Sequence, residues 1–254
     1  MNEVLGSGLA LIECPSCRDA ELSLRDGGAA LSCGSCGDAF ELRDGVCCFQ
    51  RQFDEYSENY DEICRDDLAE PKTPTIVKEI FADLVIARAA GVVCDLGSGD
   101  GFVVRRVEAP LRIAVDIAFP YVKRLPDEIL RLWARVEDVP LRSGAVDTII
   151  CTDVLEHVLD PQALAGEIDR LLKPDGRILL AFPFEQDLGV YELPEYKAKY
   201  GKYKLVHLRS IGDGLVQELF PGFTVVFERL ITEGMALMEF KPFPIKFVEL
   251  RRIG

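Results

Sequence analysis

The chain has 254 residues, of which 48% are hydrophobic and 28% charged, as in a folded globular protein of one large domain and a small module. Its net charge of −14 excludes binding to nucleic-acid phosphates or anionic membranes through overall charge. No apolar run approaches the roughly 18 residues that span a bilayer, and the N-terminus lacks the charged region of a signal peptide. We therefore expect a cytoplasmic protein with no membrane partner.

The cysteines are concentrated at the N-terminus, where six of the nine lie within the first 50 residues. An odd total with paired spacings favours metal ligation over a disulfide framework. Four cysteine thiolates would complete the tetrahedral coordination of one zinc ion and leave no open position. The zinc would therefore be structural, and it would stabilise a module that is too small to fold alone. Cys47 and Cys48 are adjacent and are interpreted as extra thiols without a metal role. The predicted zinc ligands, spaced C-x2-C, fifteen residues, C-x2-C, are Cys14, Cys17, Cys33 and Cys36.

The composition changes twice along the chain. Residues 20–24 and 29–33 alternate in polarity and predict hairpin strands within the cysteine-rich module. Residues 51–75 carry eight acidic and three basic side chains, which predicts a linker with one or two amphipathic turns, ending at Pro71 and Pro74. We expect three parts: a zinc module over 1–50, a linker and cofactor lid over 51–75, and a large domain over 76–254.

The large domain alternates between helical and strand patterns. Residues 102–109 also suit a helix, and residues 121–134 read as mostly helical with a break or kink at Pro126. The last two predicted strands, 223–231 and 235–240, are close in sequence and are expected to be antiparallel. The pattern predicts an α/β fold, a Rossmann-like, mostly parallel sheet of seven strands with helices on both faces. Further helices are predicted over 75–90, 161–176 and 210–220, and further strands over 92–96, 112–117, 146–153 and 177–184.

A glycine-rich stretch, "VVCDLGSGDGFV", follows the first strand of this domain at residues 92–103. A dinucleotide fingerprint, G-x-G-x-x-G, requires glycine at position 102, where the chain has phenylalanine. The mismatch counts against NAD. The spacing D-x-G-x-G-x-G resembles the first motif of class I S-adenosylmethionine-dependent methyltransferases of type 11.

Other segments extend this resemblance over roughly residues 53–240. Residues 146–160, with the tripeptide Leu155, Glu156 and His157, are similar to the family's stretch around its fourth strand. The resemblance implies S-adenosylmethionine as the cofactor. In this family the Leu-Glu-His tripeptide is frequently a packing and capping feature, and we retain His157 as a catalytic candidate.

The resemblance also assigns cofactor contacts. Asp95 would lie near the methionine ammonium, Asp116 would accept hydrogen bonds from both ribose hydroxyls, and Tyr60 would close over the cofactor. Where many relatives have an adenine-binding Asp, alignment places Arg135, so adenine contacts would come from the backbone of Val136 or from Glu137. The remaining residues of the implied cofactor site are Gly97, Ser98, Gly99, Gly101, Ile117, Thr152 and Asp153.

The cysteine module has a resemblance of its own. Residues 12–49 are similar to the zinc ribbon of the small methyltransferase-activator family, whose members activate separate methyltransferases or are fused in front of them. Where many relatives end in Gly-Ile-Pro, this chain has Gly45 and Val46 followed by two cysteines.

The acceptor side is expected at residues 183–209, beyond the carboxyl end of a strand, where ligands bind in doubly wound folds. This insertion is rich in tyrosine and lysine, which favours an anionic or carrier-linked acceptor; the alternative is a solvated face. His207 lies near its end and is predicted to be a base or an acceptor-binding residue, the alternative being a capping histidine.

Three hypotheses about function follow from these patterns. The first is methylation of the oxygen or nitrogen of a small, sugar-like or secondary metabolite, which the acidic balance favours. The second is an RNA methyltransferase with a zinc recognition module, although residues 1–50 carry eight acidic and only three basic side chains. The third is a non-catalytic interaction protein that kept the fold. We expect no nucleic-acid partner.

Overall fold

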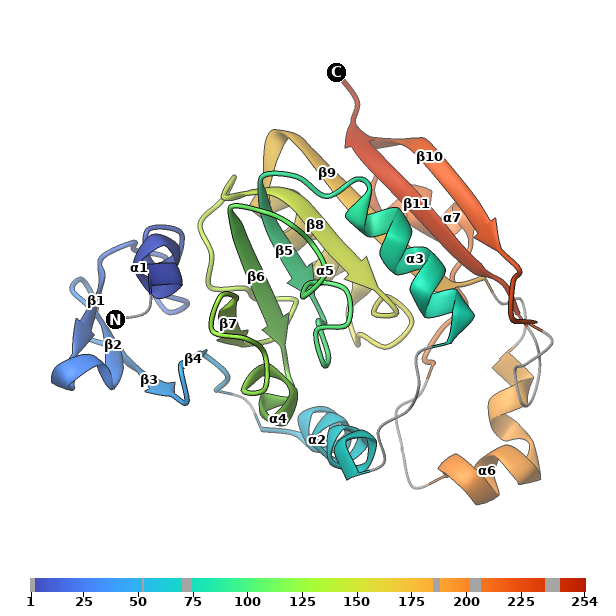
Figure 1. The fold of residues 1–254 in the computed structure, drawn as a ribbon, viewed down its shortest axis with the longest axis horizontal. Helices are drawn as coiled ribbons and strands as arrows, with labels where there is room; N and C mark the ends of the chain where they lie inside the picture. Colours follow the sequence, from blue (N-terminus) through green and yellow to red (C-terminus); the bar gives the residue numbers. More distant parts are fainter. Residues whose placement is uncertain (1–2, 52, 70–74, 185–187, 202–206, 236–242) are drawn as a thin grey trace.

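The structure is a computed structural model that describes residues 3–51, 53–69, 75–184, 188–201, 207–235 and 243–254. One continuous sheet of 11 strands runs through it (Figure 1). Its strands follow one another in the order β1 (Leu22–Arg25), β2 (Ala30–Cys33), β3 (Ala39–Arg43), β4 (Val46–Cys48), β7 (Leu130–Trp133), β6 (Leu111–Asp116), β5 (Val92–Leu96), β8 (Val146–Thr152), β9 (Leu172–Pro183), β11 (Ile245–Arg252) and β10 (Phe223–Ile231).

The strands from β7 to β10 form the α/β sheet that the sequence predicts. β5 pairs in parallel with β6 and β8, β6 with β7, and β8 with β9, whereas β11 is antiparallel to both β9 and β10. The chain therefore reverses strand order beside β5, and the carboxyl ends of β5, β6 and β8 meet at one edge. In open α/β sheets this edge is where ligands bind.

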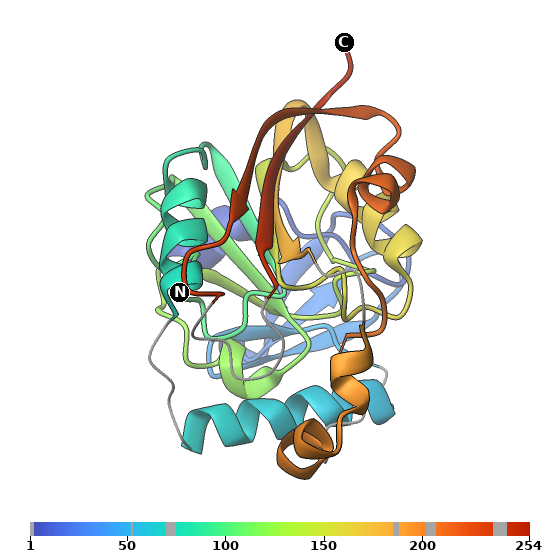
Figure 2. The ribbon, with the colours of Figure 1, turned by 90° about the vertical axis from the view of Figure 1, so that its right-hand side faces the viewer.

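Helices cover both faces of this sheet, as predicted. Helix α3 (Ile76–Ile86) lies on one face, and α5 (Pro161–Leu171) and α7 (Asp213–Leu219) lie on the other (Figure 2). Thr75 caps α3 by accepting a hydrogen bond from the Lys78 amide at 3.3 Å. Other short helices are α1 (Glu3–Leu9), α4 (Phe119–Val122) and α6 (Pro194–Tyr200), with 3-10 turns at Asp26–Gly28 and Leu188–Glu192.

The core consists of two apolar layers on either side of the sheet. Because successive side chains of a strand point to opposite faces, Val93 and Ile150 contact the layer of Phe81 on α3. Their neighbours Cys94 and Ile149 lie in the layer beneath α5. Burial on both faces explains why these strands read as continuous apolar runs.

The N-terminal module joins the same sheet. Its strands β1 and β2 form the predicted hairpin, and β4 pairs in parallel with β7 through Cys47 with Leu132 and Cys48 with Trp133. The amides of Phe49 and Gln50 then both donate to the Trp133 carbonyl at 2.9 Å. The module is therefore hydrogen-bonded to the large domain by its own backbone.

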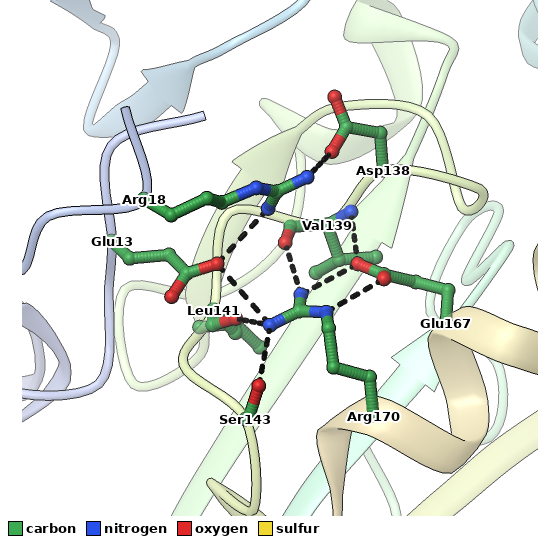
Figure 3. A network of polar contacts seen from close by, with 8 residues as sticks. All are labelled: Glu13, Arg18, Asp138, Val139, Leu141, Ser143, Glu167 and Arg170. Carbon is green, nitrogen blue, oxygen red and sulfur yellow. Dashed lines mark hydrogen bonds and ion pairs between the residues drawn. The ribbon is translucent and has the colours of Figure 1, made fainter. Parts of the chain in front are cut away.

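A network of ion pairs and hydrogen bonds stabilises the junction between the N-terminal module and the large domain (Figure 3). Arg170 of α5 donates to Glu13 of the module at 3.2 Å, to Glu167 at 2.7 and 2.8 Å and to the Val139 carbonyl at 2.9 Å. Glu167 also accepts from the Val139 amide at 2.7 Å, and Arg18 donates to Glu13 at 3.0 Å. Both glutamates are 7% exposed, so their carboxylates are largely buried, and Arg170 forms charge-assisted hydrogen bonds with both.

Several predictions of secondary structure were wrong. The linker over 51–75 contains a continuous helix, α2 (Glu55–Ala69); its predicted end at Pro71 and Pro74 lies outside the described residues. Residues 102–109 form only a turn, because the β-branched Val103 and Val104 disfavour a helix.

Two further segments differ from expectation. Residues 121–134 were expected to be mostly helical, but α4 ends at Val122 and Leu130–Trp133 is strand β7, every residue of which is buried. Of the predicted strand 235–240, all but Met235 lies outside the described residues. The antiparallel partner of β10 is β11, which the sequence patterns missed. Within the described part of the chain, no helix has the length and apolar character to cross a membrane.

Candidate cofactor and acceptor sites

The glycine-rich loop after β5 requires its glycines. Gly97, Gly99 and Gly101 have φ values of +70°, +53° and +78°, in the left-handed region that disfavours other residues. A Cβ atom on Gly97 would lie 2.5 Å from Val154, and one on Gly101 would lie 2.4 Å from Leu125. One on Gly99 would meet nothing within 4 Å. The loop is thus tightly packed at its ends and open at its middle glycine.

Asp116 holds this loop against the end of β6. One carboxylate oxygen accepts from the Gly99 amide and the other from the Ala118 amide, both at 2.8 Å. Burial raises the pKa of Asp116 to about 6, although these amides act in the opposite direction. The carboxylate is therefore fixed in position, and each oxygen retains a lone pair for a ligand.

Asp95 lies at the end of β5 and is 2% exposed. Burial, together with the charge of Asp116, raises the pKa of Asp95 to about 8. A cation bound beside Asp95 would offset both effects and favour its charged form. Two buried carboxylates on neighbouring strands therefore suit a positively charged ligand.

Two adjoining cavities of about 380 and 180 Å³ open at this edge of the sheet. Both are lined by Gly97, Gly99, Tyr121 and Asp153. Every predicted cofactor residue except Gly101 borders one of them. The larger is also lined by Asp95, Ser98 and Thr152, and the smaller by Tyr60, Asp116, Ile117, Val136 and Glu137.

Buried polar atoms at these cavities that lack hydrogen-bond partners in the described part of the chain include Ser98 Oγ and Asp153 Oδ1. Asp153 also has a φ of +54°, which is uncommon for a residue with a side chain. Unsatisfied polar atoms and strained backbone are typical of ligand sites. The pocket therefore fits a polar ligand such as S-adenosylmethionine.

Helix α2 covers the smaller cavity. Tyr56 and Tyr60 are one helical turn apart, with ring centroids separated by 5.0 Å, and the Tyr60 ring meets His157 edge-on at 6.1 Å. Tyr121 donates from its hydroxyl to Asp67 at 2.8 Å and ties the far end of α2 to α4. Sequence reasoning named Tyr60 and missed Tyr56, although their spacing of four residues was the available signal.

Arg135 stands where the sequence resemblance leads us to expect an adenine-binding Asp. In the structure it contacts residues at the start of the lid helix α2. Its guanidinium donates to Asp54 at 2.6 Å and lies 5.4 Å from the centre of the Tyr56 ring. Asp54 in turn accepts from the Ser57 amide at 3.0 Å in the turn that begins α2. Arg135 therefore fixes the start of the lid helix.

The two histidines of the chain, 50 positions apart in sequence, lie together, and His157 lines the smaller cavity. The rings of His157 and His207 are 4.9 Å apart, and His157 Nε2 is 3.9 Å from Glu156. The Tyr191 hydroxyl forms a hydrogen bond of 2.5 Å with His207 Nδ1. The predicted catalytic candidates therefore form one polar cluster next to the proposed cofactor.

Some basic side chains of the acceptor-side insertion, residues 183–209, interact with other groups of the protein. Lys197 forms an ion pair with Glu192 at 2.5 Å, and Arg209 donates to the carbonyl oxygens of Leu155 and Val158. Lys202, Tyr203 and Lys204, which contributed to the prediction of an anionic acceptor, lie outside the described residues.

The four predicted zinc ligands converge in the N-terminal module, where all their sulfur atoms lie within 4.8 Å of one another. Cys14 and Cys36 are 3.6 Å apart, and Cys17 and Cys33 are 3.5 Å apart. Zinc–sulfur bonds of about 2.3 Å in a tetrahedron place sulfur atoms about 3.8 Å apart, so the cluster fits zinc. The structure does not bring Cys47 or Cys48 into this cluster.

Comparison with known proteins agrees with this fold. Residues 94–180 match the family model described as "Methyltransferase domain". The sheet and its helices are those of a class I α/β methyltransferase. Residues 94–180 are therefore similar to a methyltransferase domain, and a module with four clustered cysteines precedes them.

Individual relatives cover this domain in part. Residues of the chain are 34% identical over 113 positions to a ubiquinone biosynthesis O-methyltransferase of Xanthomonas oryzae pv. oryzae, covering 39% of this chain and 47% of that protein. An uncharacterized protein of Methanocaldococcus jannaschii is 30% identical over 141 residues, 55% of this chain and 58% of the relative. The chain spans about half the length of the curated relatives it matches.

Solved structures extend the likeness of the fold beyond that domain. The complex of the Haloferax volcanii Trm112 methyltransferase activator with a methyltransferase has a TM-score of 0.59 at 15% identity, and the match covers 79% of this chain and 98% of that chain. Geranyl diphosphate C-methyltransferase from Streptomyces coelicolor has a TM-score of 0.58 at 13% identity, covering 80% of this chain and all of that one.

Proposed function

We propose that the chain is an S-adenosylmethionine-dependent methyltransferase that acts on a small-molecule acceptor, a sugar-like or secondary metabolite, at oxygen or nitrogen. The observation that carries this proposal is the pocket beyond β5, β6 and β8, where a left-handed glycine loop, two buried carboxylates and unsatisfied polar atoms meet. The match of residues 94–180 to a methyltransferase domain supports it. The relatives named for ubiquinone biosynthesis and geranyl diphosphate favour a small acceptor.

The cofactor would lie across both cavities. Its ammonium group would be next to Asp95, whose charged form it would stabilise. Asp116 would accept hydrogen bonds from the two ribose hydroxyls with its remaining lone pairs. The backbone at Gly99 is open to close approach by the cofactor, and Tyr60 of the lid would exclude water from above.

The reaction is an in-line displacement at carbon. The acceptor oxygen or nitrogen forms a bond to the methyl carbon while the carbon–sulfur bond breaks, and sulfur retains the electron pair as the cofactor becomes S-adenosylhomocysteine. The acceptor's proton must leave. His207 contacts the cavity-lining His157, and its Nδ1 is hydrogen-bonded to Tyr191. It is proposed either to take this proton or to bind the acceptor. The remaining contribution is alignment and the exclusion of water.

The N-terminal module is proposed to be a structural zinc ribbon that supports the large domain from within the same chain. The cysteine geometry fits zinc, and β4 is already paired with β7. The Haloferax volcanii complex joins an activator and a methyltransferase. We infer that this chain carries the corresponding two parts in one polypeptide.

Calorimetric titration with S-adenosylmethionine, S-adenosylhomocysteine and NAD tests the cofactor site. We expect the two sulfur cofactors to bind and NAD not to bind. Asp116→Asn should weaken binding about 10- to 100-fold, the usual effect of losing hydrogen bonds to a charged group. Asp175→Asn is the matched control, because Asp175 is exposed at the opposite end of the sheet. A folded protein that binds none of the three ligands would refute the proposal.

His207→Ala tests the acceptor side separately. Cofactor binding should persist in this variant, whereas transfer of the methyl group to an acceptor found by screening small metabolites should be lost. Unchanged turnover would remove His207 from the reaction.

A further inference from the structure

The two histidines of the chain and one buried carboxylate converge on a single point. One ligand atom each from Glu156, His157 and His207 lies within 4.8 Å of the other two. We propose that this triad binds a divalent metal ion, distinct from the zinc of the cysteine module, and that the ion holds the methyl acceptor. The inference rests on the proposed function in that last respect, whereas metal binding itself can be measured without it.

The fold holds the three ligands firmly. The Glu156 side chain is 1% exposed and follows β8 in a turn. The segment that carries His207 is fastened to this turn, since the Leu208 amide donates to the Glu156 carbonyl at 2.8 Å and Arg209 donates to Leu155 at 2.8 Å. Small side-chain rotations would bring the ligand atoms to the separations of about 3 Å that metal bonds of about 2.1 Å require.

Tyr191 orients one of the ligands. Its hydroxyl is 2.5 Å from His207 Nδ1, so it can accept a hydrogen bond from an Nδ1–H group, which favours the tautomer with a deprotonated Nε2 that a metal ligand requires. Metal-binding histidines almost always donate their second ring N–H to an oxygen in this way. Tyr191 would therefore be a positioning residue for the metal site.

The position of the triad suits an acceptor. His157 lines the same cavity as Asp116 and Tyr60, so the ion would lie beside the proposed cofactor. Two imidazoles and one carboxylate occupy three positions and leave others open. An acceptor hydroxyl bound there would lose its proton to water more readily, because the ion lowers its pKa, and its oxygen could then attack the methyl carbon.

The donor atoms define the class of metal. Nitrogen and carboxylate oxygen suit first-row divalent ions such as Mn²⁺, Fe²⁺ and Zn²⁺, whereas the four thiolates of the N-terminal module select softer metal ions. Mn²⁺ is therefore a probe that separates the two sites. Mn²⁺ is paramagnetic and broadens the NMR signals of nearby nuclei. Since the chain has only two histidines, each histidine signal reports directly on the proposed site.

The test uses full-length protein with its cysteine site loaded with zinc and with isotope-labelled histidine. Mn²⁺ should broaden both histidine side-chain NMR signals at concentrations that leave other signals sharp. Glu156→Gln should weaken this effect at least about tenfold, and Tyr191→Phe about 10- to 100-fold, as for other residues that orient metal ligands. Glu192→Gln, an exposed carboxylate on the same insertion, should change nothing.

Titration of the same samples with S-adenosylhomocysteine separates the two proposals. Cofactor binding without selective broadening, or equal broadening in Glu156→Gln and Glu192→Gln, would overturn the metal site and leave the methyltransferase proposal intact. Selective broadening without cofactor binding would support the metal site and count against the proposed function. Since Glu156 is buried, Tyr191→Phe keeps the test valid even where Glu156→Gln fails to fold.

Discussion

Replacing Arg170 with methionine should destabilise the whole chain, because the guanidinium joins the two modules. Its bonds to Glu167, Glu13 and the Val139 carbonyl are all 2.7 to 3.2 Å long. Without it, the carboxylate of Glu167, a residue that is 7% exposed, keeps only the Val139 amide as a partner among the residues that the structure describes. Removing one partner of a buried ion pair costs about 3–5 kcal/mol. At about 2–4 °C per kcal/mol for a chain of this size, Tm should fall by roughly 10 °C.

Denaturant unfolding of the wild type and three variants measures this value. Arg170→Met should lose about 3–5 kcal/mol, and the double variant Arg170→Met, Glu167→Leu should recover much of it, because no unpaired charge remains buried. Arg106→Met is the control, since its ion pair with Glu79 is exposed and should contribute less than about 1 kcal/mol. A loss for Arg170→Met no larger than the control's, or a double variant less stable than the single one, would refute the reasoning.

Three further predictions concern the cofactor site. Asp95→Asn should stabilise the ligand-free protein and weaken S-adenosylhomocysteine binding. Because burial raises the folded-state pKa of Asp95 to about 8, the wild type should lose more stability than the variant as pH rises from about 4 to 8, as paired pH-dependent melts would show; Asp116, with a pKa of about 6, contributes in both proteins. Gly97→Ala should destabilise the folded protein, because the added Cβ would collide with Val154, whereas Gly99→Ala should cost only about 1 kcal/mol of backbone strain but weaken cofactor binding, because its Cβ would occupy the space that the cofactor approaches; a Gly99→Ala variant with unchanged affinity in calorimetry, or one as unstable as Gly97→Ala, would contradict this. Removing zinc with a chelator should lower the cofactor affinity about tenfold, because β4 of the zinc module is followed directly by the lid helix, and adding zinc back should restore the affinity. Unchanged cofactor affinity without zinc would show that the two sites are not coupled.

Sequence patterns predicted the parts of the site that depend on local geometry. Gly97, Gly99 and Gly101 could be found because left-handed backbone selects glycine at fixed spacing. Asp116 could be found because it ends a strand next to that loop. The four cysteines could be found because zinc knuckles have a short, regular spacing.

Features that depend on distant contacts could not be predicted. The pairing of β4 with β7 joins segments more than 80 positions apart, and nothing in either segment identifies the other. Arg135 belongs to the lid because of Asp54, which lies 81 positions earlier. Strand β7 was read as helix because a four-residue strand buried on both faces has no alternation to distinguish it.

The pairing of β4 with β7 also determines how the protein responds to dilution. An activator on a separate chain dissociates as its concentration falls, whereas a covalently attached one keeps a constant effective concentration. The backbone of β4 occupies the edge of β7 that a separate strand would need. The large domain is thus permanently paired with the N-terminal module, and this pairing should be independent of protein concentration.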